Sequence, residues 1–234
     1  MSVTRFCFLL ALLALTGCAS TNPNDPFESY NRAAYRFNDA LDRAVIKPVA
    51  KGYKEVTPKP AQNMIRNFFS NLDDVVVTVN DLLQFKFAQA AADGTRVVIN
   101  STFGVFGLIN VADRLEKHNE DFGQTLGYWG VSSGPYLVIP VLGPSSVRDG
   151  AGLYVDTSYV SVIGTMDDVA ARNQTYIVQG VDQRAHLLDM EKVLDDSMLD
   201  RYAFIRDAYM MRRQNLVYDG NPPKQKFDDD DDAP

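Results

Sequence analysis

The stretch from Phe122 to Met166 limits the possible folds of this chain more than any other segment. Only three of its 45 residues are charged, although charged residues make up 23% of the chain. Its first 26 residues, 122–147, carry no charge, and a helix of that length could cross a bilayer. Five glycines and three prolines among them exclude one regular helix. Irregular backbone is tolerated inside a membrane only where protein or water forms hydrogen bonds with its polar groups. The alternatives for this segment are therefore part of a membrane-embedded protein, or a buried loop and hairpin in the core of a soluble one.

The amino terminus favours the membrane alternative. Arg5 precedes the apolar run from Phe6 to Leu15, which is the layout of a secretory signal. Leu15-Thr16-Gly17-Cys18 then matches a bacterial lipobox, which predicts that Cys18 becomes the first mature residue and carries the lipid. A multiply acylated cysteine, with palmitate among its chains, would hold the protein on its membrane. Ala19 follows in place of aspartate, which for lipoproteins of this kind indicates sorting to the outer membrane.

The rest of the chain is expected to form one domain. Residues 1–17 form the predicted signal peptide, and no internal repeat or linker within 18–219 favours two domains. Residues 220–234 contain the acidic run from Asp228 to Asp232 and are predicted to be disordered. The only other cysteine, Cys7, leaves with the signal, which excludes a disulfide and a cysteine metal site in the mature chain. The net charge of −7 argues against nucleic acid as a partner.

Several segments have helical periodicity. Asp25 is the predicted N-cap of a first helix that ends near Pro48, with an aromatic stripe expected to form core; Asn31 and Asn38 lie beside that stripe. The stripe consists of Phe27, Tyr30, Ala34, Phe37 and Leu41. A second helix is predicted from Pro60 to Leu83, where Asp73-Asp74 would break it or face water and the three valines after them would also suit a strand.

Two further regions complete the helical prediction. Residues 86–95 have helical propensity, and the uncharged run 97–112 suits a helix that is interrupted at Gly104 and Gly107 and lies in a membrane interface. From Asn173 onward, a charged pattern with regular apolar positions predicts two scaffold helices.

The sequence contains few groups for catalysis. The two histidines, His118 and His186, have no neighbours with metal-ligand spacing, so no metal and no cofactor are predicted. The segment 130–134, Gly-Val-Ser-Ser-Gly, has the form of a nucleophile elbow around Ser132, and Asp156 or Asp167 and then His186 follow in the chain order of α/β-hydrolases. An elbow requires a helix after it, whereas an extended segment is expected here, so an anchored esterase is the alternative and not the main prediction.

These residues together resemble the MlaA (VacJ) family of outer-membrane lipoproteins. The matching segments cover nearly the whole chain up to Gly220 and are specific in combination; they include 25–28, Tyr30-Asn31-Arg32, Phe37-Asn38, 47–50, Asn71-Leu72, 99–104, 122–127, 134–140, Gly143-Pro144 and Arg148-Asp149. Asp200-Arg201-Tyr202 departs from the family, which tends to have proline between the acid and the tyrosine. Asn31, Phe37, Asn38, Arg148 and Asp149 are accordingly interpreted as a structural family motif.

The resemblance implies a mainly helical, single-domain ring of interfacial helices around an amphipathic channel. It also implies porin trimers as partners and a soluble periplasmic lipid carrier as recipient. The function expected is removal of phospholipids from the outer leaflet towards the periplasm, without covalent chemistry. The alternatives are the anchored esterase and a purely structural lipoprotein that braces porins.

The segment 127–136 is predicted to gate such a channel. Residues 128–131 and 136–139 would be two extended arms joined by 132–135, with Trp129 and Tyr136 at the boundary between acyl chains and headgroups. Gly127, Gly130 and Gly134 could let the arms pivot on either side of Pro135. The alternative is a rigid turn whose glycines only satisfy local geometry.

Overall fold

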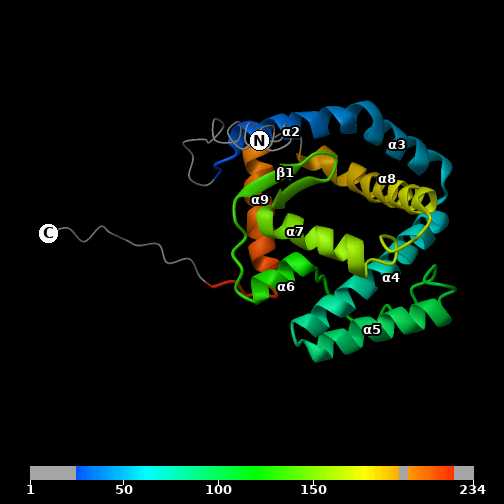
Figure 1. Cartoon of the computed structure of the whole chain (residues 1–234). Coiled ribbons are helices and arrows are strands. Elements are labelled where there is room, and N and C mark those ends of the chain that lie inside the picture. The colour runs from blue at the N-terminus through cyan, green and yellow to red at the C-terminus, as the bar shows by residue number, and fades with distance from the viewer. Residues whose placement is uncertain (1–24, 195–199, 224–234) are drawn as a thin grey trace, which may run out of the picture.

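The computed structural model describes residues 25–194 and 200–223 and is mainly helical with one small antiparallel hairpin, as expected (Figure 1). The elements are α2 (Glu28–Leu41), the π-helical turn η1 (Asp42–Ile46), α3 (Lys47–Val56), α4 (Lys59–Leu83), α5 (Phe87–Thr102), α6 (Phe122–Tyr128), β1 (Tyr136–Ile139), β2 (Gly143–Ser146), α7 (Val147–Val155), the π-helical turn η2 (Asp156–Val160), α8 (Val169–Leu194) and α9 (Arg201–Val217). Cys18 and the run from Asp228 to Asp232 lie outside the described residues.

The first helical path is longer than predicted. It does not end near Pro48: α2, η1 and α3 follow one another without a break as far as Val56. Pro48 lies in the first turn of α3, directly after η1, and a widened π turn relieves the clash that a proline ring causes in a regular helix. Asp25 is not a side-chain cap, because α2 begins at Glu28 after Phe27 and the Asp25 carboxylate is turned into the interior.

The aromatic stripe of α2 faces outward, so the prediction that it forms core was wrong. Tyr30 and Phe37 are about half exposed, at 44% and 53%, and of the stripe only Ala34 is buried. The buried polar position of this helix is Asn31. The polar side of α2 therefore contacts the rest of the fold.

Helices α4 and α5 form an antiparallel pair at one end of the molecule (Figure 1). Helix α4 continues through the three valines, so the strand alternative is excluded there. Helix α5 ends before Gly104 as predicted, because a Cβ at Gly104 would lie 2.1 Å from the Ile109 carbonyl oxygen and the next residues adopt positive φ angles. Helix α8 begins at Val169, slightly before the predicted start, and with α9 confirms the two carboxyl-terminal helices.

The hairpin lies one step further along the chain than predicted. Residues 128–131 are not a strand, because α6 extends to Tyr128 and a turn follows. The strand Tyr136–Ile139 pairs instead with Gly143–Ser146, with Tyr136 opposite Ser146 and Ile139 opposite Gly143. The connection is made by 140–142, and the chain reverses through positive φ angles at Val141 (71°) within it and at Gly143 (97°) directly after it.

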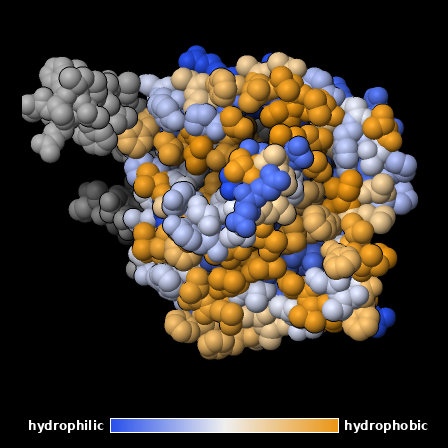
Figure 2. Space-filling view, turned by 45° about the vertical axis from the view of Figure 1, so that its right-hand side comes forward, coloured by the Kyte–Doolittle hydropathy of each residue, from blue (hydrophilic) through white to orange (hydrophobic). Residues whose placement is uncertain are grey.

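The polarity of the molecule is inverted relative to a typical soluble domain. Among the described residues, 19 polar or charged side chains are buried, but only 12 apolar ones. Large apolar side chains lie outside instead, and Figure 2 shows them over much of one face, around a hollow. Buried polar groups and large exposed apolar surface are the informative departures from a water-soluble pattern. None of the described helices combines the length and the apolar character needed to cross a membrane.

The end of α4 contains a buried carboxylate that has no hydrogen-bond partner among the residues that the structure describes. Asp74 does not face water, because it is fully buried and forms ion pairs with Arg96 and Lys117. Asp81 is also fully buried, yet neither carboxylate oxygen has a hydrogen-bond partner among the described residues. Burial, followed by repulsion from Asp93 and Glu120, raises the pKa of Asp81 to about 7.

We expect Asp81→Asn to remove part of the pH dependence of stability. The folded-state pKa is raised above the unfolded value of about 4, so the wild-type protein loses stability as pH rises from about 4 to about 7. The free energy of unfolding of the variant should therefore exceed that of the wild type at pH 8 and match it near pH 4. Denaturant unfolding at both values checks this, with Asp113→Asn at an exposed carboxylate as control. A constant difference between the proteins at all pH values would contradict it.

Candidate functional site

Two asparagines of α2 hold the free edge of β1. The Asn31 side chain donates to the Tyr136 carbonyl oxygen (3.0 Å) and accepts from the Val138 amide (2.8 Å). The Asn38 side chain does the same at the strand end, with the Ile139 oxygen (3.0 Å) and the Val141 amide (2.7 Å). Seven residues of helix and three of strand both span about 10 Å, so the two asparagines are in register with the strand. The polar positions noted in the sequence thus have a defined structural role.

The same α2 face anchors a buried aromatic cluster. Tyr136 is 1% exposed and packs edge to face against Tyr202 and Tyr209 from α9. Asp25 accepts a hydrogen bond from Asn31 (2.9 Å) and another from the Tyr202 hydroxyl. Tyr136 therefore lies in the core, and the prediction that it lies at a headgroup boundary was wrong. Phe37 takes no part in this packing core, because its ring is half exposed.

Arg148 and Asp149 belong to an ionic network that joins α6, α7 and α9. The Asp149 carboxylate accepts hydrogen bonds from Arg148 (2.9 Å), from Arg213 (2.9 and 3.1 Å) and from the Tyr209 hydroxyl (2.9 Å). Arg213 also pairs with Asp121, which caps α6 through the Gln124 amide. Burial alone would raise the pKa of Asp149, but Arg213 and Arg148 outweigh burial and lower it.

The partners of this pair could not have been found from the sequence. Arg213 is 64 residues from Asp149 and 92 residues from Asp121. Asp121 alone left a local signal, because an aspartate before the first turn of a helix is a typical N-cap. Arg148 and Asp149 therefore link α7 to α9 through Arg213, and their interpretation as a structural family motif stays a prediction.

Two of the predicted gate residues, Gly127 and Gly130, line a second feature, a pocket between α6, the start of α7 and α9. This pocket has a volume of about 600 Å³, and Gly127, Gly130 and Arg148 are part of its wall. Gly127 is helical and close-packed, since a Cβ there would lie 2.8 Å from Arg148 Nη1. Gly130 and Gly134 do adopt positive φ angles, 89° and 65°. With Ser132, which also lines it, the pocket brings together four of the residues singled out in the sequence.

Backbone hydrogen bonds tie both ends of the segment 127–136. The Val131 amide donates to the Leu126 oxygen (2.9 Å), and the Val147 amide donates to the Pro135 oxygen (3.2 Å). Trp129 is half exposed, and its Nε1 donates to the Leu83 oxygen at the end of α4 (3.2 Å). Of the two predicted arms, 136–139 is extended as β1 but 128–131 is not, and pivoting of the segment about its glycines stays a prediction.

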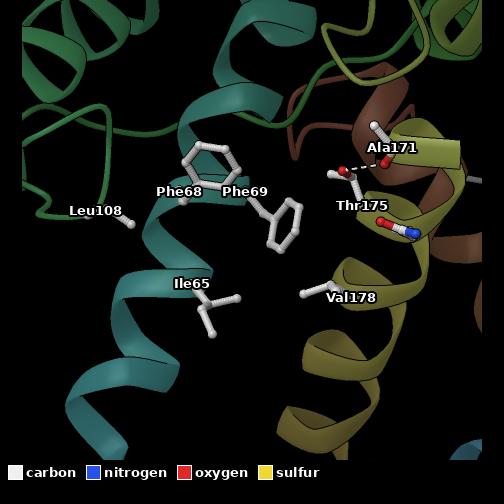
Figure 3. A pocket seen from close by; sticks show the side chains of 8 residues that line it. Ile65, Phe68, Phe69, Leu108, Ala171, Thr175 and Val178 are labelled. Atoms are coloured by element: carbon white, nitrogen blue, oxygen red, sulfur yellow. Dashed lines mark hydrogen bonds between the residues drawn. The ribbon is translucent and has the colours of Figure 1, made fainter. Parts of the chain in front are cut away.

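A third feature is an apolar pocket between α4 and α8 (Figure 3). Its volume is about 350 Å³, and its wall consists of Ile65, Phe68, Phe69, Leu108, Ala171, Gln174, Thr175 and Val178. Ile65 and Phe69 of α4 point towards Val178 of α8 (Figure 3). The Thr175 hydroxyl donates to the Ala171 oxygen of its own helix (2.8 Å), so it offers its proton to α8 and not to the pocket. The pocket suits an apolar chain better than a polar molecule.

The residues of the esterase alternative do not form a triad within the described part of the chain. Ser132 follows a turn and precedes β1, whereas a nucleophile elbow must be followed by a helix. Asp156 is engaged by the Asn80 side chain (3.0 Å) and the Phe122 amide (2.7 Å). His186 is on the exposed side of α8, and no hydrogen bond joins it to Ser132 or Asp156. No group of acidic, histidine or cysteine side chains suited to a metal ion occurs among residues 25–194 and 200–223.

Comparisons with known proteins agree with this geometry. A family profile described as "MlaA lipoprotein" matches residues 23–216. The "Intermembrane phospholipid transport system lipoprotein MlaA" of Escherichia coli K12 and that of Shigella flexneri are each 34% identical to this chain, with 94% of both chains covered. The protein of the same name from Haemophilus influenzae is 34% identical, with 93% of this chain and 92% of that protein covered.

A solved structure gives the same result for the fold. It is described as "Structural basis for maintenance of bacterial outer membrane lipid asymmetry" and has a TM-score of 0.73 at 33% identity. The match covers 82% of this chain and 98% of the solved chain. The chain therefore belongs to the MlaA lipoprotein family.

Proposed function

We propose that this protein takes phospholipids from the outer leaflet of the outer membrane and passes them towards the periplasm, which maintains lipid asymmetry. Its relatives are named as lipoproteins of an intermembrane phospholipid transport system. The observation that carries the proposal is the inverted polarity of the fold, with buried polar groups inside and apolar side chains outside. Such a surface is stable in contact with acyl chains, because it exposes apolar atoms to lipid and not to water.

The apolar pocket supplies a place for part of an acyl chain. It lies between α4 and α8 and presents aromatic and aliphatic side chains. An acyl chain in this pocket would leave water for a wall that is mostly apolar, with Gln174 and Thr175 as its polar members, and such burial favours transfer of an apolar group. Release of intact lipid then requires no covalent step. We propose accordingly that the protein acts as a conduit and not as an enzyme.

The remaining parts of the proposal concern anchoring and partners. Acylation of Cys18 would hold the protein on the outer membrane. Porin trimers are the proposed partners within that membrane, and a soluble periplasmic lipid-binding protein is the proposed recipient. The glycines at 127, 130 and 134 remain the proposed gate. A porin brace without lipid transfer is the competing function.

A charge placed in the apolar pocket should test the conduit. We expect Val178→Arg to slow phospholipid release by roughly tenfold or more, because an acyl chain would have to displace or bury the guanidinium. Val178 is 45% exposed, so the variant should still fold. The measurement is transfer of phospholipid from vesicles that contain the full-length protein to a lipid-free acceptor, with mass spectrometry of the product.

The control is Asn173→Arg, which adds the same charge at an exposed position of α8 outside the pocket wall. Equal transfer by both variants and the wild type would contradict a role for the pocket. Lipid products with shortened or hydrolysed acyl chains would support the esterase instead. A protein that binds porins but releases no lipid would favour the structural brace.

A further inference from the structure

The pocket beside α9 differs chemically from the apolar pocket between α4 and α8. The two share no wall residue. Four charged residues contribute to the wall beside α9, namely Arg148, Arg206, Arg213 and Asp207. The pocket therefore combines three cations and one anion with a volume of about 600 Å³, which is a size suited to a small polar molecule.

Two of these arginines are held in place by ion pairs with carboxylates. Arg148 and Arg213 both donate to the buried Asp149 carboxylate, and Arg213 also pairs with Asp121. Their side chains are only 7% and 11% exposed, so their positions are set by the fold. A guanidinium held in this way needs little ordering when a ligand arrives, which favours binding.

Arg206 has hydrogen-bonding capacity left over. Its Nε donates to Asp207 (2.8 Å), and its Nη1 lies 3.6 Å from the buried Asp25 carboxylate, beyond hydrogen-bond distance. Neither terminal nitrogen of Arg206 makes a hydrogen bond within the described ranges, although the side chain is only 13% exposed. A largely desolvated guanidinium with unused donors has a free energy cost that an oxyanion would relieve.

The other wall residues match the rest of a lipid headgroup. Asp207 is 60% exposed next to Arg206 and can accept hydrogen bonds from an ammonium group. Met210, Met211 and Val217 of α9 add apolar surface to the same pocket. A phospholipid headgroup carries a phosphate next to an ammonium group and a glycerol ester. In this one cavity the phosphate would meet a guanidinium, the ammonium a carboxylate, and the glycerol ester methionine side chains.

We infer that the pocket beside α9 binds the zwitterionic phosphodiester headgroup of a phospholipid, with Arg206 on the phosphate and Asp207 on the ammonium. The inference rests on the proposed function and adds a polar site to the apolar pocket. The nearby carboxylates balance much of the positive charge, so a zwitterion is bound in preference to a simple anion. Inorganic phosphate has the same oxyanion chemistry and lacks the ammonium, which allows the two sources to be separated.

The experiment uses the full-length protein in phosphate-free dodecyl maltoside and measures binding by calorimetry. The probes are glycerophosphoethanolamine, glycerol phosphate and inorganic phosphate. We expect glycerophosphoethanolamine to bind most tightly. We expect Arg206→Gln to lower the affinity for this probe by roughly tenfold or more through loss of charge-assisted hydrogen bonds. Asp207→Asn should lower the affinity for glycerophosphoethanolamine but leave the affinity for glycerol phosphate unchanged or higher. The matched control is Arg212→Gln, at an exposed arginine of α9 outside the pocket wall.

Three outcomes would overturn the inference. Equal affinity for all three probes would show a general anion site. Equal loss of binding in Arg206→Gln and Arg212→Gln would show an effect of net charge alone. Absence of binding, in a protein that still transfers phospholipid between membranes, would reject the headgroup site while the proposed function stands. Circular dichroism of each variant, with Arg206→Lys as a charge-preserving replacement, separates loss of binding from loss of folding.

Discussion

Replacement of Asp149 by alanine should lower the free energy of unfolding by about 3 to 5 kcal/mol, because it leaves two buried arginines without their shared partner. The Asp149 side chain is 6% exposed, and Arg148 and Arg213 both donate to it. The pKa of Asp149 is lowered in the folded state, so its contribution is present above the unfolded pKa of about 4 and is lost as pH falls through the folded value. The variant and the wild type should therefore converge at low pH.

Urea unfolding in dodecyl maltoside at neutral and acidic pH measures both effects. The control is Asp39→Ala, which removes an ion pair with Arg43 on the surface of α2. Arg43 is 66% exposed, so this change should cost only about 1 kcal/mol or less. If both variants lost the same stability, the network would not hold α7 to α9.

Gly152→Ala should destabilise the fold by about 3 kcal/mol or more, because α6 and α7 touch through their backbones at this residue. A Cβ on Gly152 would lie 2.3 Å from the Gly123 nitrogen and 2.6 Å from its Cα atom. Backbone cannot rotate away as a side chain can, so the two helices would have to separate. Separation would also strain the Asp121 and Asp149 pairs with Arg213, which join the same helices to α9.

A second glycine provides the matched control. Gly180 lies within α8, and a Cβ there would meet no atom within 4 Å. Gly180→Ala should therefore raise stability by about 0.5 to 1 kcal/mol, since alanine loses less conformational entropy in a helix. The same unfolding measurement applies to both variants. Similar stabilities of Gly152→Ala and Gly180→Ala would refute the close approach of α6 and α7.

Local sequence patterns predicted where helices lie better than they predicted which side chains contact one another. The periodicity from Pro60 predicted α4 to its last residue, Leu83, and the glycines at 104 and 107 marked the end of α5. The residue pair at 148 and 149 lies in a buried ionic network, and its role as a family motif stays a prediction. Its partner Arg213 was not predicted, because the chain separates them by more than 60 residues and no local signal marks such a pair.

The errors have two physical causes. The hairpin was displaced because Tyr128 to Val131 has the composition of a strand, while the ends of that segment are fixed by α6 and by backbone bonds to neighbouring segments. The aromatic stripe of α2 was placed in the core because an amphipathic helix in water buries its apolar side. In this fold the asparagine side of α2 binds β1 and the aromatic side lies outside.

The sequence by itself determined the family, the helical class and the expectation of a lipidated membrane protein, because these depend on composition, local periodicity and short motifs. The tertiary structure alone decided which side of each helix faces inward, where the hairpin pairs, and how Arg213 joins Asp121 to Asp149. It also brought Gly127, Arg148 and α9 around one pocket. These outcomes depend on free energies of contacts between segments far apart in the chain, and a linear pattern does not contain those contacts.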